Sequence, residues 1–312
     1  MGGGASKAKP KMRKTVTEAN YLHFYDKASI FTYYIDKNAG REVILTKLTK
    51  RAKMPLFPDT VQIDNHIYIT GGQNEEFSCL NSTFLFIEDK IEFHEKANMA
   101  VSKMHHTMVA VNRELLYSVG GFNWDDYSLS LCEKYSIKKN QWYEAPPLRQ
   151  RKSHVSVCTF NEAFLYKFGG FDRWNTLNSI ERVNVYSEEE GWILINLVEN
   201  VGWPRKSRWS GGAVQISPNQ VLVFGGRSFH EDGEKDAYEE NDQSFVFNAY
   251  ERTMEETEFP MEYPSSFQLC KPVLFTAKGY NEVFIIGEAV IHIYNIQQDQ
   301  WRVVSFQREY MF

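Results

Sequence analysis

The sequence predicts an all-β fold that is built from six repeated units. Three observations support this prediction: a glycine pair that recurs after short apolar runs, an alternating segment that follows each pair, and a tryptophan that closes several units. The chain has 312 residues, of which 43% are hydrophobic and 15% aromatic. This composition suffices for a large core, and a repeat fold of this length forms one domain.

The first half of each unit is an apolar run that ends in the glycine pair. The pairs close the segments ITGG at Gly72, YSVGG at Gly121, YKFGG at Gly170 and LVFGG at Gly226. Their first glycines lie 49, 49 and 56 residues apart. A downstream copy at 281–288 keeps one glycine, and an upstream copy at 20–27 keeps neither. A period near ~50 residues is typical of repeat folds in which each unit packs on its neighbours.

The second half of each unit is an alternating strand, a polar turn and often a tryptophan. Three such segments end at Trp142, Trp192 and Trp301, and looser versions lie at 30–43, 82–93 and 244–254. Because the three tryptophans recur at one place in the repeat, we expect them to be core residues. Six first halves and six second halves make six units.

The residue pattern explains why such units need neighbours. Ile67 and Ile69 alternate with Tyr68 and Thr70, which indicates a strand packed on both faces. The glycine pairs stand at strand ends, where we expect positive φ or a close approach to a neighbouring unit. A single sheet cannot bury both faces, whereas a closed ring of sheets can.

On these residues the chain resembles the kelch-repeat proteins, over residues 14 to 304. The resemblance implies a six-bladed kelch-type β-propeller of four-stranded antiparallel blades. We assign residues 1–13 to a flexible basic tail and residues 14–312 to the propeller. We expect the first blade to take its inner strand from Lys14 to Glu18. Alternatively, the returning segment from Ser305 to Phe312 supplies that strand.

The tail differs in charge from the rest of the chain. Residues 1 to 14 carry five basic residues and no acid, while the whole chain has a net charge of −5. The opening MGGGAS fits the N-myristoylation pattern, with Gly2 as the lipidation site. One acyl chain needs a second signal, which the basic residues supply near an anionic membrane. The alternative is a solvated Gly/Lys tail. We expect a cytoplasmic protein, associated with a membrane or the cytoskeleton through this terminus.

Motifs for catalysis, metals and cofactors are absent from the sequence. It has no GxSxG, HExxH, P-loop or GxGxxG motif, and its four cysteines show no CxxC spacing. Adjacent His105 and His106 should point to opposite faces of a strand, which is a poor arrangement for one metal ion. We therefore expect no metal site, no cofactor and no enzymatic activity.

The topology of four-stranded blades predicts a functional surface. The connection after each glycine pair and the connection between blades emerge on the same side of the ring, which we call the loop face. The predicted partner-binding residues on it are Phe122, Trp124, Phe171, Trp174, Arg151, Arg208 and Arg227. Trp and Arg are the residues that most often anchor interfaces. The alternative is that the aromatic residues fold back over the blades.

The resemblance implies mainly a protein-binding platform. We expect a scaffold or adaptor that binds an acidic or aromatic-bearing segment of a partner protein, as a monomer or as part of a larger complex. The alternative function is small-molecule chemistry in the central channel, resembling the sialic acid mutarotase type of kelch propeller. Nucleic-acid binding is not expected, because the body of the chain is acidic.

Overall fold

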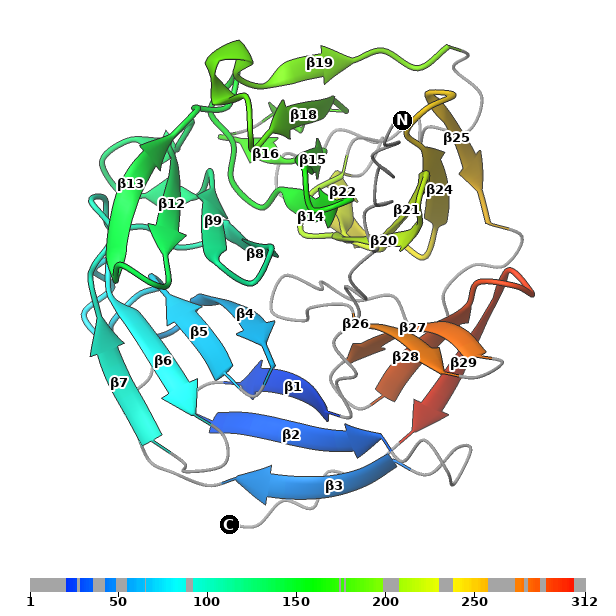
Figure 1. The fold of residues 1–312 in the computed structure, drawn as a ribbon, viewed down its shortest axis with the longest axis horizontal. Coiled ribbons are helices and arrows are strands. Elements are labelled where there is room, and N and C mark those ends of the chain that lie inside the picture. The colour runs from blue at the N-terminus through cyan, green and yellow to red at the C-terminus, as the bar shows by residue number, and fades with distance from the viewer. Residues whose placement is uncertain are drawn as a thin grey trace, which may run out of the picture.

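The fold is a ring of antiparallel β-sheets around a common centre (Figure 1). The computed structural model describes residues 21–26, 29–35, 43–48, 55–64, 66–87, 92–173, 175–176, 178–198, 208–229, 238–257, 273–277, 280–286 and 290–305. No helix in this part of the chain has the length and apolar character that a membrane crossing needs.

Five of the sheets have four strands, and we call them blades I to V. Blade I contains β4 (Asp59–Ile63), β5 (His66–Thr70), β6 (Thr83–Ile87) and β7 (Glu92–Lys96). Blade II contains β8 (Thr107–Val111), β9 (Leu115–Val119), β12 (Cys132–Ser136) and β13 (Gln141–Ala145). Blade III contains β14 (Ser156–Phe160), β15 (Phe164–Phe168), β18 (Ile180–Asn184) and β19 (Ile193–Ile195), with a 3₁₀ turn at Glu188–Glu190. Blade IV contains β20 (Gly212–Ser217), β21 (Gln220–Phe224), β24 (Ser244–Asn248) and β25 (Thr253–Glu256). Blade V contains β26 (Val273–Ala277), β27 (Tyr280–Ile286), β28 (Val290–Asn295) and β29 (Gln300–Ser305).

A three-stranded sheet occupies the remaining place in the ring, between blades I and V (Figure 1). It contains β1 (Tyr21–Asp26), β2 (Ser29–Ile35) and β3 (Val43–Leu48). The segment predicted to complete it, Lys14 to Glu18, lies outside the described residues. Of the alternative segment, Ser305 is the last residue of β29 and pairs with Val290, and the residues after it are not described. The structure therefore contains five complete blades, and a sixth stays a prediction.

Each blade has its first strand nearest the centre and its fourth strand at the rim (Figure 1). In blade II, one row of paired residues runs outward from Ala110 through Leu116 and Tyr135 to Trp142. Neighbouring residues of β9 then serve different interfaces. Leu116 packs in a cluster with residues of blade I, whereas Tyr117 packs in a cluster with residues of blade III. The period-2 pattern thus places the core between the blades.

The recurring tryptophans fasten each blade to the blade before it. The indole N–H of Trp142 donates to Ala97 O at 2.9 Å, that of Trp192 to Pro146 O at 2.9 Å, and that of Trp301 to Ser244 Oγ at 2.9 Å. Each acceptor belongs to, or directly follows, a strand of the preceding blade. Trp192 is buried, as expected of a core residue, whereas Trp142 and Trp301 are half-buried.

The glycine pairs form the joints between successive blades on the loop face. Gly169 has φ of +61°, and an added Cβ would lie 2.3 Å from the carbonyl oxygen of Arg208, which belongs to the segment entering the next blade. The amide of the second glycine, Gly170, donates to that same carbonyl at 3.0 Å. The pairs at Gly71 and Gly120 repeat this geometry with Lys103 O and Lys152 O. Both predicted reasons for glycine, positive φ and close approach, are confirmed.

Candidate functional site

Three short hairpins extend the loop face directly after the glycine pairs. They are β10–β11 (Phe122–Asn123 and Tyr127–Ser128), β16–β17 (Phe171–Asp172 and Asn175–Thr176) and β22–β23 (Arg227–Phe229 and Tyr238–Glu240). The first residue of each hairpin pairs with the segment that enters its own blade, in the bridges Met104–Phe122, Ser153–Phe171 and Trp209–Arg227. Two sets of loops that are distant in sequence are therefore tied into one surface.

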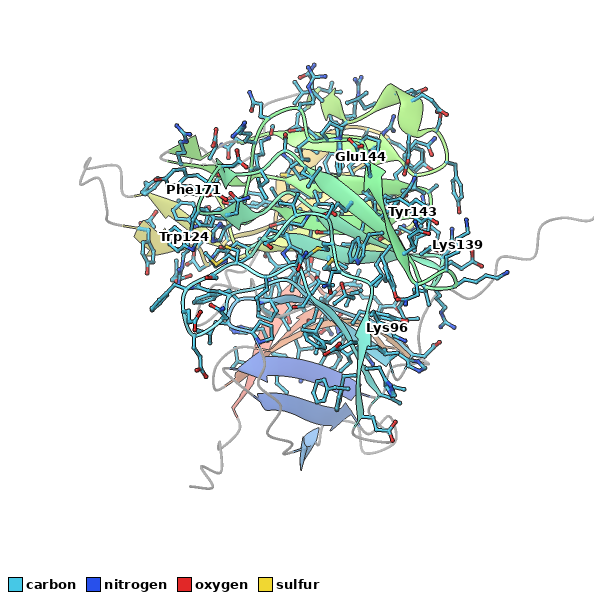
Figure 2. All side chains as sticks on the ribbon, turned by 90° about the vertical axis from the view of Figure 1, so that its left-hand side faces the viewer. Lys96, Trp124, Lys139, Tyr143, Glu144 and Phe171 are labelled. Carbon is cyan, nitrogen blue, oxygen red and sulfur yellow. The ribbon has the colours of Figure 1, made fainter. Side chains whose placement is uncertain are left out.

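Figure 2 shows the ring from its side, with Trp124 and Phe171 on one side and Lys139 on the other. The predicted separation of a loop face from an opposite face is thus visible in the structure. Lys139 belongs to the turn between the third and fourth strands of blade II. This turn and the turn between the first and second strands make up the opposite face.

A stack of rings follows the bridges on the loop face. Phe57, His105, His154 and Ser210 come directly after the bridging residues, and their φ angles are 51°, 53°, 55° and 57°. The His105 and His154 rings stack at 4.2 Å, and Phe57 lies 5.1 Å from His105. The backbone continues this link, because the amide of His154 donates to His105 O and that of Ser210 to His154 O. Positive φ at non-glycine residues is uncommon, and such strain gathers at functional sites.

The adjacent histidines of this region have separate environments, although, contrary to the sequence-based prediction, neither lies in a strand, because both precede β8. His106 is buried and its Nε2 lies 2.8 Å from Thr70 Oγ1, whereas His105 joins the stack. Burial, with the neighbouring His105 and Arg227, holds the pKa of His154 well below its ordinary value. His154 is therefore neutral at physiological pH. Among the described residues, no group of three or more metal-ligating side chains is placed to hold a metal ion.

Exposed aromatic side chains gather on the loop face. Of the ten large apolar side chains that are exposed in the described part of the chain, six lie in its loops: Leu56, Phe57, Phe77, Trp124, Tyr127 and Tyr238. Half-buried and buried rings support them. Phe122 meets Trp124 edge-on at 5.1 Å, and Trp209 lies 4.9 Å from Phe229 and 5.4 Å from Phe171. An exposed apolar surface of this kind marks interaction sites.

Two of the predicted arginines lie on this surface. Arg151 is exposed, and its Nη1 lies 3.4 Å from Asp126 Oδ1. Arg227 is half-buried, donates from Nε to Glu240 Oε1 at 2.7 Å and covers the Tyr238 ring at 4.5 Å. Arg173, which was not predicted, covers the Tyr127 ring at 5.3 Å. Each predicted arginine on this surface thus already faces a carboxylate of its own chain.

Arg208 does not lie on this surface, and its prediction as a partner-binding residue is wrong. Its side chain is buried beneath the joint between blades III and IV, where Nη1 donates to Gly225 O and Gln243 O at 3.1 and 3.2 Å. The guanidinium also covers the Phe245 ring at 4.8 Å. Burial lowers its pKa to about 10, with Glu256 and Asp242 opposing the shift. Arg208 remains a cation that serves the fold.

Buried lysines occupy the place of Arg208 at two other joints, which shows that this position in the repeat carries a buried cation. Lys103 and Lys152 are fully buried and pair with Glu133 at 2.8 Å and with Glu181 at 2.6 Å, on the third strands of their own blades. Phe245 occupies the equivalent place on the third strand of blade IV. A buried cation thus recurs at the entrance of these blades, with a carboxylate or a ring as its partner.

The remaining predicted residues are exposed to different degrees. Trp124 is 55% exposed, and its indole N–H donates to Phe77 O at 2.7 Å. Phe122 and Phe171 are half-buried, so each folds partly over its blade, as the alternative interpretation expected. Trp174 and Gly2 lie outside the described residues. The assignment of these residues to partner binding or lipidation stays a prediction.

Sequence reasoning missed Phe57, Phe77 and Tyr238. A signal for the first was present, because His105, His154 and Ser210 each stand fifteen residues before the first glycine of their blade, and Phe57 stands fourteen before Gly71. The loop that contains Tyr238 reads mainly as charge in the sequence, and this concealed its aromatic residue.

Comparison with known proteins agrees with this architecture. Residues 105–149, which begin at the stacked His105 and span blade II, match the kelch motif. The fold is therefore a β-propeller whose second blade carries a kelch motif. No curated protein sequence matches it. Among solved structures, it is similar to YjhT, with a TM-score of 0.70 and 11% identity over 92% of this chain and 97% of YjhT. At that identity the likeness concerns the fold alone.

Proposed function

We propose that this β-propeller protein is a non-enzymatic scaffold or adaptor that binds a partner protein on its loop face. The observation that carries the proposal is the gathering of six of the ten exposed large apolar side chains in the loops of that face. They come from blades I, II and IV and rest on a rigid backbone network of bridges and glycine joints. Aromatic anchors on a rigid support bind with little loss of side-chain entropy.

The environments of the predicted arginines bear on which chemical class of partner segment can bind to the loop face. The sequence predicted an acidic or aromatic-bearing segment. The aromatic part is retained in this proposal, because rings can pack against Trp124, Phe171 and, by sequence, Trp174. The acidic part rested on Arg151 and Arg227, each of which already faces a carboxylate of this chain, and on Arg208, which is buried.

The alternative function, small-molecule chemistry in the central channel, requires acids and bases on the inner strands. In the described inner strands of blades I to V, which are β4, β8, β14, β20 and β26, Asp59 is the only carboxylate. It is buried, and its oxygens accept the backbone amides of Thr60 at 2.8 Å and Met108 at 2.5 Å. A carboxylate committed to structural hydrogen bonds favours the binding role over the channel enzyme.

Two further parts of the proposal rest on the sequence. We propose that β1–β3 belongs to a sixth blade, whose inner strand Lys14–Glu18 supplies. We also propose that acylation of Gly2 and the basic tail bring a cytoplasmic protein to membranes, because one acyl chain with a polybasic segment meets the requirement for two signals.

Affinity capture with matched surface variants tests the binding face. The native protein, a loop-face variant (Trp124→Ala with Tyr238→Ala) and an opposite-face variant (Tyr186→Ala with Tyr250→Ala) are compared for the proteins that they retain from lysate. All four side chains are exposed, between 49% and 72%. Anchor residues contribute about 2 kcal/mol or more each, so the loop-face variant should lose partners that the other two proteins retain. Loss in the opposite-face variant alone, at unchanged melting temperature, would show that the assigned face is wrong.

A further inference from the structure

The corner between blades I and II holds the most exposed aromatic side chains of the loop face. Phe77 is 69% exposed, Trp124 55% and Tyr127 48%. The hydrogen bond from Trp124 Nε1 to Phe77 O, at 2.7 Å, joins the loop of blade I to the hairpin of blade II. The Phe122 ring packs edge-on against the rings of Trp124 and Tyr127, with distances of 5.1 and 5.9 Å between ring centres. We call Phe77, Trp124, Tyr127 and the acidic residues beside them the blade I–II corner.

The backbone holds the rings of this corner outward. Phe77 and Tyr127 both have φ of 63°, in the left-handed region that large side chains rarely adopt. Side-chain caps fix both loops: Asn74 Oδ1 accepts the amides of Glu76 and Ser78 at 3.0 and 2.8 Å, and Asn123 Oδ1 accepts the amide of Asp126 at 2.7 Å. The exposed rings are therefore preorganised.

Carboxylates surround the rings. Glu75, Glu76, Asp125 and Asp126 are all exposed and lie within two residues of Phe77 or Trp124 in sequence. Arg151 pairs with Asp126, and Arg173 lies over Tyr127, so four acids and two bases leave the corner with a net charge of −2. Within the described residues, the side chains of Glu75, Glu76 and Asp125 make neither an ion pair nor a hydrogen bond.

The same face already shows how such groups bind a cation. The Arg227 guanidinium lies 4.5 Å from the centre of the Tyr238 ring and donates to Glu240 at 2.7 Å. Arg173 covers Tyr127 in a similar way. Trp124 offers a better ring face for a cation than tyrosine does, and the free carboxylate of Asp125 adjoins it. In the described part of the chain no cation covers Trp124.

We propose that the blade I–II corner binds a lysine- or arginine-bearing segment of the partner protein. The cationic head lies over the Trp124 indole and donates to Asp125, Glu75 or Glu76, while its aliphatic stem packs on Phe77. This inference rests on the proposed function and specifies its partner. It replaces the acidic segment that the sequence predicted with a basic one, because the free charge of this corner is negative.

Degenerate peptide libraries test the charge of the bound segment. Three nine-residue libraries of equal hydrophobic content carry three Lys or Arg, three Glu, or three Gln around one fixed Leu. Each is offered to the full-length protein, and dissociation constants are measured by fluorescence polarisation for the enriched peptides. We expect selective enrichment from the basic library, with affinity that falls as salt screens the attraction.

Matched variants locate the binding. Trp124→Ala, and separately Asp125→Asn with Glu75→Gln and Glu76→Gln, should each weaken the enriched basic peptides about tenfold or more. The controls on the opposite face are Tyr250→Ala and Glu189→Gln with Glu190→Gln, which should leave affinity within twofold. Melting temperature is recorded for every variant.

Each remaining outcome overturns the inference in a recognisable way. Enrichment of the acidic or neutral library, lost in Trp124→Ala, would reject the basic segment and leave the loop-face function standing. Binding that only the opposite-face variants weaken would reject both proposals. No enrichment from any library would reject a linear segment as the ligand. Binding that emerges only after Lys7, Lys9 and Lys11 are changed to Gln would assign the corner to the chain's own tail instead of a partner.

Discussion

Replacing Glu181 by Gln removes the carboxylate that two buried lysines of blade III share. Glu181 Oε1 lies 2.6 Å from Lys152 Nζ and 3.0 Å from Lys167 Nζ, and the three side chains are at most 2% exposed. Burial opposes the charge of Glu181, but the two lysines outweigh it and lower its pKa from 4.5 to about 2. That pKa corresponds to about 3 kcal/mol of stabilisation of the carboxylate.

The expected loss of stability follows from these contacts. Breaking a buried ion pair costs about 3–5 kcal/mol, because the remaining charge stays buried without a partner. In a chain of this size, that loss lowers the melting temperature by roughly 5–15 °C. Differential scanning calorimetry at neutral pH measures it. Because the folded pKa lies below the unfolded value, this contribution is present above about pH 4.5 and disappears as the pH falls toward 2. In the Glu181→Gln variant, the free energy of unfolding should therefore fall less between about pH 4.5 and pH 2 than it does in the native protein.

Blade II provides the matched control for this substitution. Glu133 faces one lysine, Lys103, at 2.8 Å, so Glu133→Gln should cost less than Glu181→Gln. Adding Lys167→Met to Glu181→Gln removes one of the two unpaired cations and should recover part of the loss. The reasoning is refuted if Glu181→Gln melts within 1 °C of the native protein or if the Glu133 variant is the less stable of the two.

Four other outcomes are expected. Gly169→Val should destabilise the fold by several kcal/mol, about 1–3 from backbone strain and a similar amount from the clash with the next blade. Gly191 has φ of +64° and nothing within 4 Å of an added Cβ, so Gly191→Ala should show the strain alone. Urea denaturation of both variants measures the two contributions. His154 should stay neutral through the physiological range, which its imidazole NMR shifts would report. Stability should fall as the pH drops below 6.5, since burial also lowers the pKa of His292 to about 4 and both rings resist protonation in the fold; thermal melts across pH 4–7 measure this. Gly2→Ala should release the protein from membranes to the soluble fraction, and intact mass should show an unmodified terminus.

The sequence was sufficient to predict the repeat, the joints and the sides of the ring. A glycine pair that recurs at strand ends has few physical causes, and both that were considered, positive φ and close approach, occur at Gly169. Because successive strands of a blade run in opposite directions, alternate connections emerge on opposite sides of the ring. Trp124 and Lys139 therefore lie on opposite sides, as Figure 2 shows. These features depend on local backbone geometry, which a repeated sequence records many times.

The exposure of individual cations could not be predicted in this way. The residues next to Lys152 and Arg208 in sequence do not distinguish a buried cation from an exposed one. The partner of each cation lies on the third strand of the same blade. Glu181 is that partner in blade III and Phe245 in blade IV, each more than 25 residues downstream. The charge of the loop face was misjudged in part for the same reason, since Arg208, one of the three arginines predicted on it, is internal.

The residues at the joints divide their roles between two blades. Lys152 sends its side chain to Glu181 in its own blade, while its carbonyl oxygen accepts the amide of Gly121 from the blade before. The amides of Gly72 and Gly170 are bound in the same way at the neighbouring joints. Each of these amides can exchange its proton with solvent only when its own joint opens, because no atom within its own blade accepts that hydrogen bond. The hydrogen-exchange rates of these three amides would therefore report the opening of each joint separately. The amide that exchanges first identifies the joint at which the ring first opens.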